Sequence, residues 1–417
     1  MLSAIETPLL LIRRLSRRLG VRVTAFALVA LGISALAPLA EGALGDGLTG
    51  LVGREAVMPV LTILASSMLA VSTFSINVMV SAYRAAAASA TPRVHRLLLE
   101  DTTTQTVLST FIGAFVYALT SILLFQTGAM ADDAAVIVMA MTVLIVFLVI
   151  TAMLRWIHHL SVLGSVDHSL EVATARARET LRRFARAPAL GGIPLTDDTV
   201  LPQELQPVRA SASGYIQLID VAMLERCLPD GAFLYLRRIP GDMVLEGTVI
   251  AEMSGTHGPP LAANIAEAVV IGPTRSYEQD PEFGLLVLSE IASKALSPGI
   301  NDPGTAIIAT DKAAALLWDH ARTEPEPTGQ RAPRVFVPVN TTDDLFEAAF
   351  AATARTAAGT PEVVGHLLEV LNSLAEAPGC DRPATEMAAR VLDHAERSID
   401  NPHDLETLRA RAPAGRT

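Results

Sequence analysis

Ala295-Leu296-Ser297-Pro298-Gly299-Ile300-Asn301-Asp302-Pro303-Gly304-Thr305-Ala306 joins two apolar segments that have the spacing of helices. Their patterns predict one helix over Pro281–Leu296 and a second over Pro303–Ala321. An Asp-Pro pair opens each helix. An Asp side chain can accept from the free N–H groups at a helix start, and Pro suits the first helical position. The stretch therefore predicts a helix hairpin with two capped starts.

Four polar residues around this hairpin form a candidate site. Asp280 and Asp302 have capping roles, and Asn301 tolerates the left-handed backbone of a turn. Helix capping does not explain why an arginine stands at position 275, upstream of the first helix. It also does not explain why an asparagine stands at position 301. We therefore predict that Arg275, Asp280, Asn301 and Asp302 share one polar cluster.

The sequence carries no signature of an enzyme. Polar groups for a site could come from Arg275, Glu278, Asp280, Glu290, Lys294, Asn301 and Asp302. However, we find no nucleophile–base pair, P-loop, Gly-x-Ser-x-Gly turn or metal-ligand spacing. Cys227 and Cys380 are far apart and have no Cys-x-x-Cys spacing, which is typical of buried small hydrophobic residues. We expect no catalytic activity, no cofactor and no metal.

Composition indicates an integral membrane protein with a large soluble part. Of the 417 residues, 51% are hydrophobic, which is high for a soluble protein. The apolar residues dominate the first 155 positions and thin out afterwards. The net charge is −11, and the acidic second half argues against a nucleic-acid partner.

Apolar runs predict an α-helical membrane domain over residues 21–155. Its four transmembrane helices are Val21–Ala40, Ala56–Ala82, Thr104–Phe125 and Ala134–Leu154. A basic amphipathic segment, residues 1–20, precedes the first. A secretory signal is the alternative for this region. Against it, the run is long enough to cross a bilayer, and Pro38 directly follows the tidy Ala-x-Ala site.

Arginine residues predict the orientation in the membrane. They gather before the first span, between the second and third, and after the fourth, whereas the other two loops hold only Arg54. Positively charged loops stay in the cytoplasm. We therefore expect the N-terminus and the C-terminus to be cytoplasmic, and the lipid bilayer of a bacterial inner membrane to surround the spans.

The second span has a polar face, made of Thr62, Ser66, Thr73, Asn77 and Ser81. Polar groups are tolerated inside a bilayer where they face protein or water. Two interpretations follow. The face could line a path for a solute, or it could be a packing seam where small side chains let helices approach.

The rest of the chain predicts a cytoplasmic α+β domain. Its parts are a polar helix that extends the fourth span (156–190), a small β-rich module (191–260), a helix-hairpin module (261–322) and a helical C-terminal part that opens with a strand (333–410).

These motifs together resemble a bacterial family of predicted membrane proteins, the domain of unknown function 2254 family. The strongest match runs from Arg275-Ser276-Tyr277-Glu278-Gln279-Asp280-Pro281 to Ser297-Pro298-Gly299-Ile300-Asn301-Asp302-Pro303, and weaker ones are Ser213–Gln217 with Asp220, and Thr91-Pro92-Arg93 followed by Leu97–Asp101. The family pattern Ser-Ser-Gln-aromatic-Ser-Pro-Arg is reduced to its Pro-Arg here. The resemblance implies the membrane-plus-soluble architecture and no particular activity.

Two functions fit this architecture. The first is a homo-oligomeric channel or transport-related protein with a cytoplasmic regulatory domain. The second is a membrane-anchored scaffold or sensor that binds a protein partner or a small ligand through its cytoplasmic domain. The polar face of the second span favours the first, and the absence of catalytic motifs together with the number of soluble modules favours the second.

Overall fold

The computed structural model describes residues 53–89, 91–99, 101–130, 134–160, 162–255, 259–324 and 332–412, together with Val21, Thr24, Ala25, Leu28 and Gly32. These residues form two compact units. The membrane unit comprises the described residues of 5–88 and 95–168. The soluble unit comprises Ser89–Val94 and the described residues from Ser169 onward.

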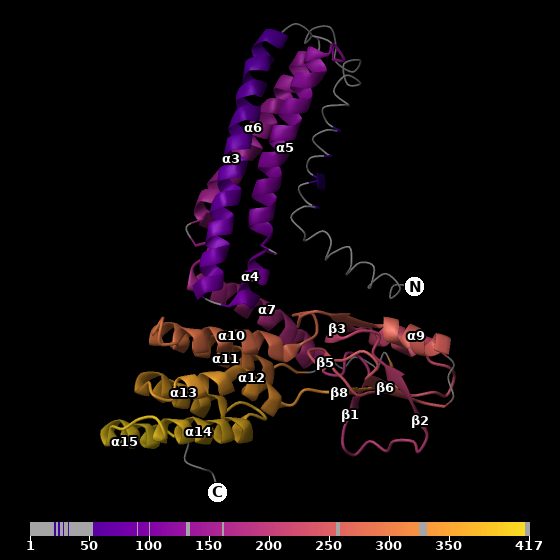
Figure 1. Cartoon of the computed structure of the whole chain (residues 1–417), viewed down its shortest axis with the longest axis vertical. Helices are drawn as coiled ribbons and strands as arrows, with labels where there is room; N and C mark the ends of the chain where they lie inside the picture. Colours follow the sequence, from indigo (N-terminus) through magenta and orange to yellow (C-terminus); the bar gives the residue numbers. More distant parts are fainter. Residues whose placement is uncertain are drawn as a thin grey trace. The chain divides into compact units, whose positions relative to one another are not determined.

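Three helices of the membrane unit are long and apolar enough to cross a membrane, and they lie side by side (Figure 1). They are α3 (Arg54–Ser89), α5 (Thr102–Gln126) and α6 (Ala135–Leu160), with the short α4 (Pro92–Leu99) between α3 and α5 in the chain. The second, third and fourth predicted spans are thus confirmed as apolar helices. The predicted first span and the segment 1–20 lie outside the described residues, apart from five helical positions between 21 and 32.

The fourth span does not continue into a polar helix, so the prediction of one helix through 156–190 is wrong. Helix α6 ends at Leu160, and a separate helix, α7 (Val166–Arg186), follows a turn. Gly164 has a φ of +88° in that turn, a conformation that favours glycine. The Ser165 Oγ then accepts from the backbone N–H of His168 at 3.1 Å and caps the new helix.

The soluble unit contains two sheets. The larger has the order β1-β8-β4-β6-β2, made of β1 (Ile193–Leu195), β8 (Val335–Pro338), β4 (Leu234–Leu236), β6 (Val249–Ser254) and β2 (Leu205–Arg209). Its β8 pairs in parallel with both β1 and β4, whereas the remaining pairs are antiparallel. The smaller sheet is antiparallel, with β3 (Gly214–Ile219) between β5 (Met243–Val244) and β7 (Val269–Gly272).

Both sheets recruit strands from outside the predicted β module of residues 191–260. Strand β7 completes the small sheet, and β8, from the predicted C-terminal part, lies between β1 and β4 in the large one. Alternating apolar residues predict that these strands exist. They do not predict which strand lies beside which, because pairing depends on contacts far apart in sequence.

Helices fill the remainder of the soluble unit and lie beside the sheets (Figure 1). They are α8 (Val221–Cys227), α9 (Pro259–Glu267), α10 (Pro281–Ala295), α11 (Pro303–Ala321), α12 (Thr342–Thr356), α13 (Pro361–Leu374), α14 (Asp381–Glu396) and α15 (Pro402–Arg411). The hairpin prediction is confirmed. Asp280 accepts from the N–H of Phe283 and Asp302 from that of Thr305, and each starts its helix. Thr360, which directly precedes α13, makes no capping hydrogen bond with its side chain.

Candidate functional site

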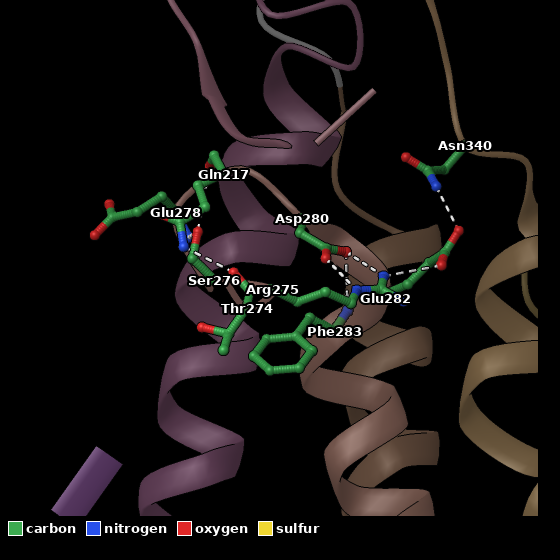
Figure 2. Close-up of polar contacts among 9 residues, drawn as sticks. All are labelled: Gln217, Thr274, Arg275, Ser276, Glu278, Asp280, Glu282, Phe283 and Asn340. Atoms are coloured by element: carbon green, nitrogen blue, oxygen red, sulfur yellow. Dashed lines mark hydrogen bonds and ion pairs between the residues drawn. The ribbon is translucent and has the colours of Figure 1, made fainter. Parts of the chain in front are cut away.

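The centre of the candidate site is a buried ion pair at the start of α10 (Figure 2). The Arg275 guanidinium donates from Nε to Asp280 Oδ2 at 2.6 Å and from Nη2 to Asp280 Oδ1 at 2.7 Å. Asp280 is only 1% exposed, and it also accepts from the N–H of Phe283. One carboxylate therefore both caps α10 and holds the arginine in a two-bonded geometry.

A second carboxylate extends this pair toward another part of the chain. Arg275 Nη2 also donates to Glu282 Oε2 at 3.1 Å, and the other oxygen of Glu282 accepts from Asn340 Nδ2 at 2.6 Å. Asn340 belongs to the connection between β8 and α12. The chain of contacts Asn340–Glu282–Arg275–Asp280 thus links the large sheet to the helices.

Two neighbouring carboxylates keep the arginine ionised. Burial disfavours the charged guanidinium, but the hydrogen bonds and charge of Asp280, and then of Glu282, outweigh it and raise the pKa of Arg275. Burial also raises the pKa of the Asp280 carboxyl, against the opposing pull of Arg275. The Arg275 side chain further lies 5.7 Å from the Phe283 ring centroid, within cation–π range.

The small sheet covers and positions this cluster. Gly241, in the turn before β5, has a φ of +104°, and a Cβ there would lie 2.6 Å from Asp280 Oδ2. Gln217 of β3 donates to the Thr274 carbonyl at 2.7 Å, and Ser276 donates to the Gln217 carbonyl at 3.2 Å. The segment that carries Arg275 is therefore fixed along β3.

The structure brings together only half of the predicted four-residue cluster. Asn301 and Asp302 follow the C-terminal end of α10, whereas Arg275 and Asp280 lie at its start. The 15 residues of α10 separate the two ends by about 22 Å. Asp302 is exposed and accepts from Thr305 Oγ1 at 2.6 Å, while Asn301 has a φ of +50°. These two residues shape the turn, and the prediction of one shared cluster is wrong for them.

Glu290 has a partner that is distant in sequence. Within the soluble unit, Glu290 accepts from Arg93, the arginine of the Thr91-Pro92-Arg93 motif. Tyr277, whose ring centroid lies 4.7 Å from that of Phe283, is half-buried nearby. Burial and then the charge of Glu290 raise the pKa of Tyr277.

The polar face of the second span is turned away from its neighbours. Its five residues, Thr62, Ser66, Thr73, Asn77 and Ser81, are all exposed on α3. The opposite side of α3 is buried in the membrane unit and includes Leu61, Met68 and Ser75. The face is therefore no seam between α3 and the other described spans.

Hydrogen bonds within α3 satisfy part of that face. Thr62 and Thr73 donate to the carbonyls four residues earlier, at 2.9 Å and 3.0 Å. Ser66 donates to the Thr62 carbonyl at 2.9 Å. Asn77 makes no such bond among the described residues. Its amide is thus the group on α3 that most needs an outside partner.

Sequence reasoning missed a polar cluster at one end of the membrane unit. Asp101 caps α5 and lies 2.9 Å from His159 Nε2 near the end of α6, and Thr104 Oγ1 is 3.1 Å from the same nitrogen. Burial would raise the pKa of Asp101, but the hydrogen bonds from His159 and Thr104 outweigh it and hold the pKa well below its usual range. The Asp-Thr-Thr start of α5 is a visible capping signal, but the distant His159 is not.

Metal binding finds no support in the described part of the chain, where no three His, Cys, Asp or Glu side chains gather closely enough to hold an ion. The Arg275 cluster contains no nucleophile, and its guanidinium is committed to two carboxylates. These contacts hold parts of the soluble unit together. That the protein is no enzyme stays a prediction.

His320 gives the soluble unit a pH dependence. It stacks on Phe184 of α7 with ring centroids 5.6 Å apart, and its Nδ1 is buried without a hydrogen-bond partner among the described residues. Burial lowers the pKa of His320, against a hydrogen bond with the Leu181 backbone. The folded chain therefore resists protonation of this imidazole more than the unfolded chain does.

We expect the free energy of unfolding to fall as the pH drops below about 6.5, because the unfolded chain then takes up a proton that folded His320 resists. Above that pH both states are neutral at this group, and it contributes nothing. The slope from this one group is at most about 1.4 kcal/mol per pH unit. Urea unfolding of the full chain in detergent, compared at about pH 7.5 and about pH 5.5, measures it. His320→Phe keeps the ring stack and should flatten the dependence, so an unchanged slope would contradict the assignment.

Comparison of the sequence with known proteins places the chain in a family. The family described as Predicted membrane protein (DUF2254) matches residues 16–373. Uncharacterized protein Rv1290c of Mycobacterium tuberculosis and Uncharacterized protein Mb1321c of Mycobacterium bovis are each 25% identical over 352 residues, covering 80% of this chain and 66% of the relative. The chain thus spans slightly less than two thirds of the length of these relatives. No solved structure matches the chain.

Proposed function

Because the chain belongs to the DUF2254 family of predicted membrane proteins, we propose that it acts as a homo-oligomeric channel or transport-related protein with a regulatory soluble unit. The face of α3 defined by Thr62, Ser66, Thr73, Asn77 and Ser81 lies between copies and lines the path. This proposal rests on one observation, the outward exposure of that face.

The membrane environment is the reason why this exposure matters. Helix α3 is apolar enough to span a bilayer, and lipid tails offer no hydrogen bonds to an amide such as that of Asn77. Copies inserted in the same orientation and related by an axis along the membrane normal place identical residues at equal depth. Asn77 of each copy then has a polar partner, or water, on the axis.

The proposed topology has four spans, with Val21–Ala40 as the first, and both termini in the cytoplasm of a bacterial cell. The arginines between α3 and α5 and those from Arg155 onward support this orientation, because they lie on one side of the three described spans. The soluble unit is then cytoplasmic, at the inner membrane.

Flux measurement in liposomes tests the transport role. The purified full chain should pass potassium, chloride or phosphate, and Asn77→Leu should reduce that flux by about tenfold or more, because an apolar side chain removes the polar group from the path. Phe74→Leu is the matched control, since Phe74 is 64% exposed at the edge of the same face. Absence of flux for all three ions in the unaltered protein would rule the channel out.

A membrane-anchored scaffold or sensor is the second candidate. A partly open cavity of about 290 Å³ in the soluble unit favours it, because a ligand could bind there without any transport. In that case liposomes would carry no flux, while the full chain in detergent would show a ligand-dependent rise in its melting temperature or capture a protein partner.

A further inference from the structure

The cavity lies where four parts of the soluble unit meet. Its lining includes Phe184 at the end of α7, and Leu317 and His320 of α11. It also includes Asn340 and Thr342, around the start of α12, and Cys380, just before α14. The volume of about 290 Å³ is at the lower end of the range for small-molecule sites.

The lining selects an uncharged ligand. The lining of the cavity contains no Asp, Glu, Lys or Arg, and burial disfavours the charged form of His320, the histidine in this lining. The backbone N–H groups at the start of α12 would favour an anion, but Asp343 and Asp344 occupy the first turn of that helix and oppose it. An anion or a cation would therefore lose hydration here without gaining a paired charge.

Asn340 supplies a fixed hydrogen-bond acceptor. Its Nδ2 donates to Glu282, which is itself held by Arg275, so the orientation of the amide is set. Its oxygen is directed away from Glu282 (Figure 2). A ligand that meets this oxygen must donate an N–H or O–H.

The stacked rings of Phe184 and His320 give the lining an aromatic part. Their planes are 18° apart, and both residues line the cavity. A planar ring compound gains contact area against aromatic side chains without a large loss of conformational freedom.

We propose that this cavity binds a small, flat, uncharged ring compound that bears an N–H donor, a molecule of nucleobase or nicotinamide size. Asn340 accepts from the donor, the Phe184–His320 pair packs on the ring, and Glu282 and Arg275 are positioning residues for Asn340. The site links ligand binding to the cluster at the start of α10.

Protection of Cys380 provides the test. In the Cys227→Ser chain Cys380 is the remaining thiol. It lines the cavity but is buried, so its slow alkylation by N-ethylmaleimide reports on how often the cavity opens. The full chain in detergent is incubated with nicotinamide, adenine or uracil at about 1 mM. At least one should slow alkylation by about fivefold or more and raise the melting temperature. Nicotinate, the charged counterpart of nicotinamide, should do neither.

Variants separate this site from general stability. Asn340→Leu should abolish protection, whereas Asn372→Leu, on α13 and bonded to the Arg411 carbonyl, should leave it intact. Ala321→Phe, which fills the partly exposed wall of the cavity, should abolish it too if Asn340→Leu does not fold. The proposal is overturned if none of the three neutral probes protects Cys380, or if nicotinate protects it as well as nicotinamide. Flux through α3 plays no part in this outcome.

Discussion

Replacing Arg275 with alanine is expected to lower the free energy of unfolding of the soluble unit by about 3–5 kcal/mol. The substitution leaves the Asp280 carboxylate, which is 1% exposed, without its cation in the interior. It also removes the hydrogen bond to Glu282, and so loosens the link to Asn340. Urea unfolding of the full chain in detergent, followed by the fluorescence of Trp318 in α11, measures the loss.

An exposed arginine pair provides the matched control. Arg237 donates two hydrogen bonds to Glu252 on the large sheet, but both side chains are about one third exposed. Arg237→Ala should therefore cost no more than about 1 kcal/mol. Similar losses for the two variants would mean that burial of the Arg275–Asp280 pair has no special importance. The double variant Arg275→Ala/Asp280→Asn should recover part of the stability, because Asn still caps α10 without a buried charge.

The second large effect is expected at Gly284, where α10 touches α7. A Cβ at Gly284 would lie 2.3 Å from the Cβ and 2.7 Å from the Cα of Ala177, closer than real side chains approach. The two helices must separate to admit even a methyl group. Gly284→Ala should therefore destabilise the soluble unit by about 2–3 kcal/mol, although alanine is the better helix former by about 1 kcal/mol.

Gly304 tests whether that cost comes from packing. It lies in the first turn of α11, where an added Cβ meets only Asp302 Oδ1 at an ordinary 3.4 Å. Gly304→Ala should be neutral or stabilising by up to about 1 kcal/mol. The measurement is the urea concentration at which each variant unfolds. If Gly284→Ala and Gly304→Ala unfold at the same urea concentration, the close contact of α7 and α10 is disproved.

The sequence predicts local structure well in this protein because local signals are strong. The apolar length of α3, α5 and α6 identifies them as spans, and Asp-Pro pairs mark the starts of α10 and α11. The break after α6 was not anticipated. A glycine such as Gly164 is tolerated in many helices, so its presence alone does not predict a break. Only its positive φ in the structure shows that the helix does not continue through it.

The candidate site could be predicted only where its residues are close in sequence. Arg275 and Asp280 are five positions apart and lie in one motif, and they do form a pair. Glu282 and Asn340 are 58 positions apart, and their contact depends on where β8 enters the large sheet. Asn301 is near Asp280 in the motif but distant in space, because the intervening residues form the straight helix α10. Spacing in the sequence alone predicts neither the Glu282–Asn340 contact nor the separation of Asn301 from Asp280.

The interpretation of the polar face on α3 also changed with the structure. Spacing alone left a packing seam and a solute path open. The exposure of Ser66 and Asn77, opposite the buried Ser75, directs the face toward something outside the described helices. We propose a second copy of the chain there, and the alternative occupant is the first span, Val21–Ala40.

Disulfide cross-linking in native membranes distinguishes these occupants most directly. In a chain with Cys227→Ser and Cys380→Ser, Ser66→Cys and Ser81→Cys each place a thiol on the exposed face, whereas Ser75→Cys places one on the buried side of the same helix. All three substitutions exchange a serine for a cysteine of similar size, so they differ only in position. On mild oxidation we expect dimers from Ser66→Cys and Ser81→Cys and none from Ser75→Cys, because identical residues of two parallel copies meet at one depth. Monomers at all three positions would contradict an α3 interface between copies.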